Sequence, residues 1–203
     1  MYSITTKVFF SHSKNDRRLI NYFSNIFTNI GLQGMFFEWQ REYNRYAGET
    51  IANIISHPDT SALFVLLGPA LQNPPGSSSP YTHNWVSFEV GVAAGCRKPI
   101  WVFEEFGSFV RYPVPLVTDY AQYTPGSVEH LQYYGTVFQD RIGSETFSIQ
   151  PPRTFQCEYT NCNARYRHWS VSKSFNCPVC RQPIPKGRTT GFTKPPGFPS
   201  NVV

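Results

Sequence analysis

The sequence predicts an α/β protein with a parallel central sheet, followed by a small cysteine-containing module. Over the first 150 residues, short apolar runs alternate with stretches of helical periodicity, which is typical of a parallel sheet covered by helices on both faces. The apolar runs are continuous rather than alternating, as expected for strands that are buried on both faces. Four of the five cysteines lie beyond residue 150, close together in the chain.

The first half of the sheet is predicted from four segments. Lys7–Ser11 (KVFFS) is a continuous apolar run and is expected to form the first strand. A helix is expected next, because apolar residues recur at three- and four-residue spacing over residues 19–30 and Gly31 provides a C-terminal stop. Met35–Glu38 is expected to form the second strand, and Glu49–Ile55 a short helix.

The second half continues this alternation. Ala62–Leu67 (ALFVLL) is the clearest strand, and Trp85–Cys96 has helical spacing with Gly and Ala on one side, which lets a helix pack closely on a sheet. Pro99–Phe103 and Val117–Tyr123 are expected to form the fourth and fifth strands, with Val128–Ile142 as a closing helix. Five parallel strands suit the flavodoxin-like order 2-1-3-4-5, in which ligands bind at the carboxyl ends of the strands.

The composition fits a globular protein and excludes general disorder. Of 203 residues, 40% are hydrophobic and 15% are charged, which are ordinary proportions. No apolar run approaches the roughly 18 to 20 residues that span a bilayer. The first ten residues (MYSITTKVFF) lack a basic region followed by an apolar core, so we expect no signal peptide. The expectation is a cytoplasmic protein that does not associate with membranes.

The distribution of charge separates the chain into two parts. Residues 1–150 hold 10 Lys and Arg against 12 Asp and Glu, whereas residues 151–203 hold eight against one. A shift this sharp marks a module boundary. We therefore expect a main domain at residues 1–148, a small module at 149–188 and a flexible tail at 189–203.

The cysteine spacing in the small module predicts a metal site. Cys157-x4-Cys162 is followed after 14 residues by Cys177-x2-Cys180, a pattern similar to a zinc ribbon, in which each turn presents two thiolates to a tetrahedral Zn2+. Four thiolates saturate the ion, so its role would be structural, and it would stabilise a module too small to fold alone. Free or disulfide-bonded cysteines, or His168 in place of one cysteine, are the alternatives.

Three segments resemble Toll/interleukin-1 receptor (TIR) domains, in the order that this family has them. Lys7–Asp16 (KVFFSHSKND) is similar to the opening strand of the family with its Ser-aromatic-Ser and Asp. Arg41–Ile51 (REYNRYAGETI) resembles the loop after the second strand, although Ala47 replaces the usual Pro. Trp85–Val92 (WVSFEVGV) resembles the Trp-x3-Glu segment. The resemblance spans roughly residues 5–145 and is strongest to prokaryotic Thoeris-type TIR proteins of antiphage defence.

This resemblance implies an enzyme that cleaves NAD+ between nicotinamide and ribose. The enzymatic members of the family release ADP-ribose or a cyclic variant of it as an immune signal. Nicotinamide in NAD+ is already a cationic leaving group, so the reaction needs no general acid, and a carboxylate can stabilise the oxocarbenium-like ribose. The implied partners are NAD+ as substrate, other copies of the chain through TIR–TIR association, and a downstream effector that senses the product.

Glu89 is the residue that the resemblance identifies as the catalytic carboxylate. It follows Trp85 by four residues, so the two side chains share one face of a helix. A solvated carboxylate on the helix surface is the alternative interpretation. The neighbours Val86, Phe88 and Val90 argue against it, because they make the helix apolar on most sides.

Six further residues are candidates for substrate binding: Phe10, Ser11, His12, Trp39, Tyr46 and Trp85. The ring of Phe10 or His12 could stack on a nucleobase or on nicotinamide, and the Ser11 hydroxyl could bind a ribose or a phosphate. Phe10 suits the core equally well, and Ser11 suits a helix cap. Trp39 and Tyr46 could form an aromatic lid or a protein contact. Trp85 suits packing beside the site.

Two other functions compete with NAD+ cleavage. A non-enzymatic TIR adaptor would act through TIR–TIR association, but it has no need of an acid at the position of Glu89. A nucleoside deoxyribosyltransferase-like enzyme shares the sheet and a catalytic Glu, but lacks the serine-rich strand end and the Trp-x3-Glu pairing. Basic and aromatic residues interleave over Arg165–Trp169, as in some nucleic-acid contacts. Bound thiolates leave the module only modestly positive, so we expect no nucleic-acid partner.

Overall fold

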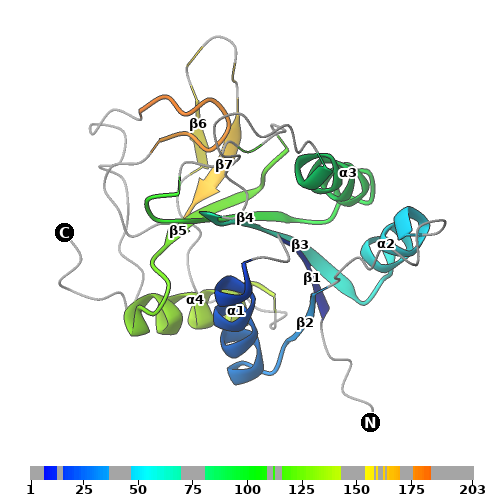
Figure 1. Ribbon diagram of the computed structural model, residues 1–203, viewed down its shortest axis with the longest axis horizontal. Coiled ribbons are helices and arrows are strands. Elements are labelled where there is room, and N and C mark those ends of the chain that lie inside the picture. Colours follow the sequence, from blue (N-terminus) through cyan, green and yellow to red (C-terminus); the bar gives the residue numbers. More distant parts are fainter. Residues whose placement is uncertain are drawn as a thin grey trace.

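The computed structural model describes residues 7–12, 16–36, 47–69, 81–108, 112, 116–142, 154–157, 159, 162, 164–169 and 176–183. These residues form one sheet with helices on both faces (Figure 1). The strands are β1 (Lys7–Ser11), β2 (Gln33–Phe36), β3 (Thr60–Leu67), β4 (Ile100–Glu105), β5 (Asp119–Tyr123), β6 (Thr154–Gln156) and β7 (Arg165–His168). The helices are α1 (Arg17–Asn29), α2 (Ala47–Ser56), α3 (Tyr81–Gly95) and α4 (Val128–Arg141).

The α/β class and the order of the first five strands are as predicted. These strands are parallel and lie in the order β2-β1-β3-β4-β5. Every residue of β4 is buried, which explains why the apolar runs in the sequence are continuous. The carboxyl ends of β1, β3 and β4 therefore meet at one edge of the sheet, where Ser11, Leu67 and Glu105 are the last strand residues.

The predicted strand count is wrong, because the described residues form a sheet of seven strands rather than five. β7 pairs in parallel with β5, with Asp119 opposite Arg167 and Tyr120 opposite His168, and β6 pairs antiparallel with β7. An exposed edge strand offers unpaired N–H and C=O groups, and β7 satisfies those of β5. Strands from the main part of the chain and from the cysteine-containing part thus belong to the same sheet.

Two hydrophobic cores lie on opposite faces of this sheet. One lies beneath α1 and α4 and is rich in aromatic rings, including Phe23, Phe64 and Phe138. The other lies beneath α2 and α3 and also contains Cys157 and Tyr166. Figure 1 shows α1 and α4 together on one side of the sheet, and the cysteine-containing part shares the core on the other side.

Most element boundaries lie within a few residues of those predicted. The second strand lies at Gln33–Phe36, two residues earlier than expected, because Gly31 adopts φ 72° and turns the chain directly from α1 into β2. α3 begins at Tyr81 instead of Trp85, within a stretch whose composition is typical of a loop. Within the described parts of the chain, no helix combines the length and apolar character needed to cross a membrane.

Candidate active site and metal centre

Glu89 lies in the middle of α3 and is almost completely buried, with 8% of its surface exposed. Val86, Val90 and Ala93 of the same helix pack into the core beneath it. Burial disfavours the charged carboxylate and raises the pKa of Glu89 from its ordinary value of 4.5 to about 7. Glu89 is therefore a buried acid that changes its protonation state close to neutral pH.

Ser11 is the last residue of β1 and lies beside Glu89. It is buried, and its hydroxyl lies close enough to the Glu89 carboxylate to lower that group's pKa, although by less than burial raises it. Alternation along β1 places Ser11 and Phe9 on one face of the sheet and Phe10 on the other. Phe9 packs in the same core as Val86 of α3. The fold thus joins two residues that are 78 positions apart in the sequence.

Phe10 lies in the core on the opposite face of the sheet. Its ring centroid lies 6.0 Å, 5.1 Å and 5.3 Å from those of Phe23, Phe27 and Phe64, respectively. With 1% of its surface exposed, Phe10 has no open ring face on which a substrate could stack. Phe10 therefore packs the core beneath α1 and α4.

The remaining candidates flank the Ser11–Glu89 pair or lie outside the described residues. His12 follows β1 directly and is partly buried. Trp85 precedes Glu89 by one helical turn, packs against the core beneath α3, and meets the ring of Phe88 edge-on with centroids 5.7 Å apart. Two candidates lie outside the described residues: Trp39 and Tyr46.

Three more buried acids lie at the same edge of the sheet. Asp16 immediately precedes α1, and Glu104 and Glu105 are the last two residues of β4. Arg18 forms an ion pair with Glu105, and Arg181 forms one with Glu104. Both acids of β4 at this edge are therefore paired with an arginine.

The clustered cysteines form a second candidate site. The Sγ atoms of Cys157 and Cys180 lie 3.6 Å apart, those of Cys162 and Cys177 lie 3.7 Å apart, and all four lie within 4.8 Å of one another. A tetrahedron with metal–sulfur bonds of about 2.3 Å has edges of about 3.8 Å, whereas a disulfide requires about 2.05 Å. None of the four forms a disulfide, and the cluster could hold a metal ion, as predicted.

Arg181 connects the cysteine cluster to β4. Its backbone N–H donates to the carbonyl oxygen of Cys177 at 2.9 Å, and its Nη1 donates to Oε1 of Glu104 at 2.7 Å. The Tyr120 hydroxyl donates to Oε2 of the same carboxylate at 2.6 Å. Burial raises the pKa of Glu104, while Arg181 and Tyr120 act in the opposite direction. A fully buried acid of β4 is thus held by the turn that carries two of the cysteines.

Asp119 connects β7 to β5. It is completely buried and accepts hydrogen bonds from Nε and Nη2 of Arg167 and from Nε1 of Trp169, each at 2.7 Å. The backbone N–H of Trp169 donates to the carbonyl oxygen of Tyr120 at 2.8 Å. The Trp169 ring stacks on Trp101, with centroids 5.5 Å apart, in the core beneath α4. The C-terminal part of the chain therefore contributes to both cores.

Sequence reasoning missed these two buried networks. The Asp119–Arg167 and Glu104–Arg181 hydrogen bonds join residues 48 and 77 positions apart, so no local pattern reveals the partners. One signal was present in the sequence, because both acids lie in strands whose other residues are mostly apolar or aromatic. Buried acids in such positions almost always have a charged or hydrogen-bonding partner.

No protein-family model matches the chain, and no curated protein is significantly similar to it. Similarity to a characterised protein therefore assigns no role to any of these residues. Two sites in the described residues carry chemically distinctive groups: a buried carboxylate beside a serine, and a cluster of four thiols.

Proposed function

We propose that this chain cleaves NAD+ at the bond between nicotinamide and ribose, with Glu89 as the catalytic carboxylate. The observation that carries the proposal is the burial of Glu89 beside Ser11, where β1 of a parallel sheet ends. Open α/β sheets bind their ligands at this edge. The resemblance of three short segments to TIR domains supports the same reaction and implies that its product serves as a signal in antiphage defence.

The proposed reaction needs one well-placed negative charge. The C–N bond to the nicotinamide nitrogen breaks, both bonding electrons stay with that nitrogen, and neutral nicotinamide leaves. Positive charge develops on the ribose, and the Glu89 carboxylate stabilises it while accepting hydrogen bonds from ribose hydroxyls. Water or a nucleophile within the same molecule then attacks the ribose carbon and loses a proton, giving ADP-ribose or a cyclic product.

The surroundings of Glu89 strengthen this electrostatic effect. A carboxylate in a low-dielectric site interacts with a developing cation far more strongly than one in water. Ser11 lies beside Glu89 and favours its charged form, so its proposed role is that of a positioning residue.

We further propose that the cysteine cluster binds a structural Zn2+. The two short Sγ–Sγ distances, 3.6 Å and 3.7 Å, lie close to the edge of a tetrahedral zinc–thiolate site. Four thiolates complete the coordination sphere, so no position is left for a substrate or an activated water. The metal would stabilise the turns that carry Cys177 and Arg181.

Incubation of the purified full chain with NAD+, followed by separation of nicotinamide and its partner product, tests the enzymatic proposal. We expect nicotinamide release by the wild type and a loss of at least about 100-fold in Glu89→Gln, because a preorganised electrostatic partner is removed. Glu129→Gln makes the same chemical change at an exposed position of α4 and should retain wild-type turnover.

The partner product identifies the acceptor of the ribosyl group. ADP-ribose indicates hydrolysis, an isomer lacking nicotinamide indicates cyclisation, and a new base on the ribose indicates exchange. Undiminished turnover by Glu89→Gln contradicts the proposed mechanism. Absence of nicotinamide release, even from protein forced into assemblies, favours the non-enzymatic TIR adaptor.

A further inference from the structure

An open pocket of about 380 Å3 lies at the edge of the sheet opposite to the Ser11–Glu89 pair. It is formed where α3 ends and where β4 and β5 begin. Its wall is mainly apolar and consists of Ala94, Pro99, Ile100, Leu116 and Val117. Leu116 is unusually exposed for a leucine, with 44% of its surface accessible. Ligand pockets of this size typically combine such an apolar wall with a few polar groups that set the orientation of the ligand.

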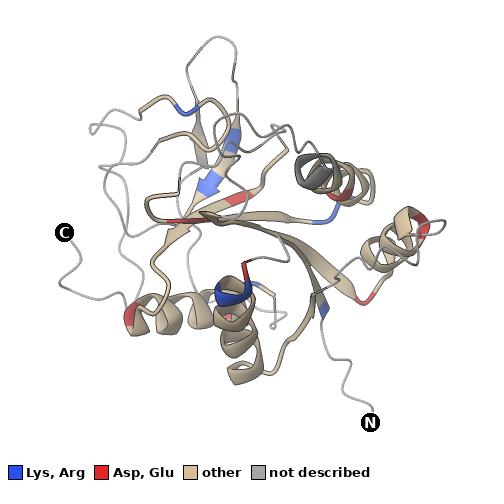
Figure 2. Cartoon of the chain, viewed as in Figure 1, with Lys and Arg blue, Asp and Glu red and all other residues tan. Residues whose placement is uncertain are grey.

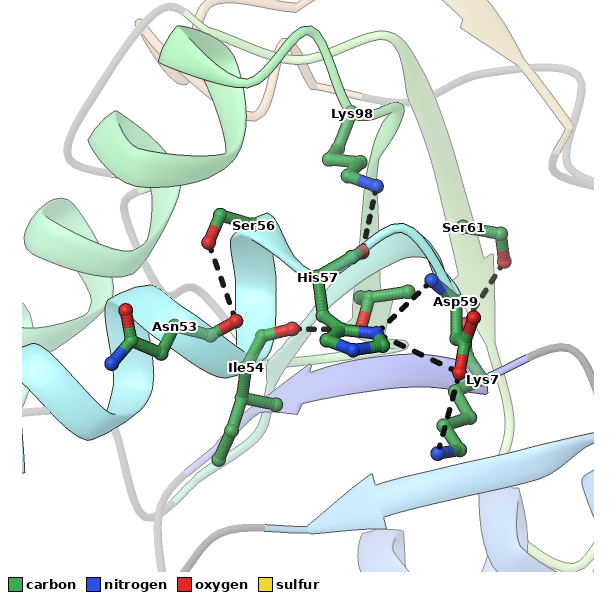
Figure 3. Close-up of polar contacts among 9 residues, drawn as sticks. Lys7, Asn53, Ile54, Ser56, His57, Asp59, Ser61 and Lys98 are labelled. Atoms are coloured by element: carbon green, nitrogen blue, oxygen red, sulfur yellow. Dashed lines mark hydrogen bonds and ion pairs between the residues drawn. The ribbon is translucent and has the colours of Figure 1, made fainter.

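The polar residues of this pocket are three cations, Arg97, Lys98 and Arg167, together with Thr118, whose hydroxyl bonds the backbone of Ile100. Lys98 donates from Nζ to the carbonyl oxygen of His57 at 3.0 Å (Figure 3), which leaves two of its three N–H groups available. Arg167 uses Nε and Nη2 to bind Asp119, which leaves Nη1. Figure 2 shows basic positions on β7 and just before β4.

Arg97 is the most available of the three cations. Its side chain is exposed, and it forms no ion pair within the described parts of the chain. Its backbone has φ 57°, the left-handed conformation in which glycine commonly follows the last turn of a helix. An arginine there costs backbone strain, and such strain is found most often where a side chain has a specific role.

We propose that this pocket binds a small aryl phosphate, that is, an apolar ring carrying a phosphate group. The ring packs on the apolar wall between Leu116 and Ile100. The phosphate accepts charge-assisted hydrogen bonds from Arg97, Lys98 and the remaining Nη1 of Arg167. The site is separate from the Ser11–Glu89 pair, so the proposal does not depend on NAD+ cleavage.

Binding of 1-naphthyl phosphate to the full chain, measured by titration calorimetry, tests the proposal. Two further probes separate the groups: inorganic phosphate carries only the charge, and 1-naphthol carries only the ring. We expect 1-naphthyl phosphate to bind at least about tenfold more tightly than either. Arg97→Gly suits the local backbone and should fold normally, yet it should weaken binding of 1-naphthyl phosphate by at least about tenfold.

Two further variants distinguish the site from a general charge effect. Arg165→Gln removes a cation from an exposed position on β7 outside the pocket and should bind the probe as the wild type does. Glu89→Gln should also bind it normally. The proposal is overturned if the wild type binds 1-naphthyl phosphate and inorganic phosphate with equal affinity. It is also overturned if Arg97→Gly binds 1-naphthyl phosphate as tightly as the wild type does, or if Arg97→Gly and Arg165→Gln lose the same affinity for it. Failure of 1-naphthyl phosphate to bind at millimolar concentration overturns it as well.

Discussion

Burial gives Glu89 opposite effects on stability and on chemistry. A buried carboxylate stabilises a developing cation strongly, but its charged form loses the solvation that it has in the unfolded chain. The rise of its pKa from 4.5 to about 7 corresponds to about 3 kcal/mol at one 1.36 kcal/mol step per pKa unit. A residue that lowers stability at neutral pH is expected where function requires it.

The raised pKa of Glu89 predicts a stability difference between the wild type and Glu89→Gln that depends on pH. Between pH 4.5 and about 7 the unfolded chain has released the Glu89 proton while the folded chain retains it. The folded state therefore binds more protons, and the wild-type free energy of unfolding falls as pH rises through this window. Glutamine does not titrate. The variant should gain up to about 3 kcal/mol relative to the wild type between pH 4.5 and pH 8.

Denaturant unfolding of both proteins at pH 4.5, 6 and 8 measures this difference. Other titrating groups contribute equally to the free energy of unfolding of the two proteins, so they cancel in the difference. Any constant effect of the amide cancels when the differences at the three pH values are compared. A stability difference that does not change with pH would show that the Glu89 carboxyl is solvated in the folded chain. That result would also remove the basis for its proposed catalytic role.

Asp119 links β5 to β7 through its side chain. It is completely buried and accepts three hydrogen bonds from Arg167 and Trp169. In Asp119→Asn an amide replaces an acceptor-only carboxylate and leaves the guanidinium without its counterion. Leaving a buried hydrogen-bonding partner unsatisfied typically costs about 1–3 kcal/mol. Asp119 is fully buried and Arg167 is 35% exposed, so we expect a loss of that size in the free energy of unfolding.

Asp59→Asn provides the matched control for this prediction. Asp59 and Lys7 form an ion pair of 3.8 Å in which both side chains are substantially exposed, as Figure 3 shows at the amino edge of the sheet. Exposed pairs contribute about 0–1 kcal/mol. Equal losses in the two variants would mean that the Asp119 network does not hold the C-terminal strands in place.

The cysteine cluster and β4 are also predicted to lose stability together. Removal of the metal by a chelator frees the turn that carries Arg181, and buried Glu104 then lacks its cation. We expect one zinc per chain and a Tm lowered by at least about 5 °C after chelation. Arg181→Gly suits the local φ of 63° and should retain the zinc while still lowering Tm. An unchanged Tm after complete removal of the metal contradicts this coupling.

The helices and the first five strands were predictable because their signals are local. Continuous apolar runs identified β1, β3 and β4, and helical spacing identified α1 and most of α3. β7 was not predicted as part of the sheet, because its pairing with β5 depends on residues 48 positions apart. The same limit applies to Glu104 and Arg181, whose contact depends on the fold of both parts of the chain.

The candidate site was predictable only in part, for a related reason. Alternation along a strand puts Phe10 and Ser11 on opposite faces of β1, but the sequence does not show which face α3 covers. The structure brings Ser11 to Glu89 and places Phe10 among Phe23, Phe27 and Phe64. The cysteine spacing, by contrast, was enough to predict the thiol cluster, because two short turns each present a pair of thiolates.

At the scale of the whole molecule, the C-terminal part is an integral component of the fold. Cys157, Tyr166 and Cys177 pack in the core beneath α2 and α3, and Trp169 packs in the core beneath α4. Removing this part would expose apolar surface on both faces of the sheet and leave the edge of β5 unpaired. Unpaired edges of this kind promote aggregation.

A pair of truncations tests this dependence. A chain that ends at residue 148 loses β6, β7 and the cysteine cluster, and should be insoluble or should unfold without a cooperative transition. A chain that ends at residue 188 keeps every described residue and should retain the Tm of the full chain. Circular dichroism melts and the soluble yield compare the two. If the shorter chain folds cooperatively with the Tm of the full chain, the main domain is independent, and the Asp119 and Glu104 networks only dock a separate module onto it.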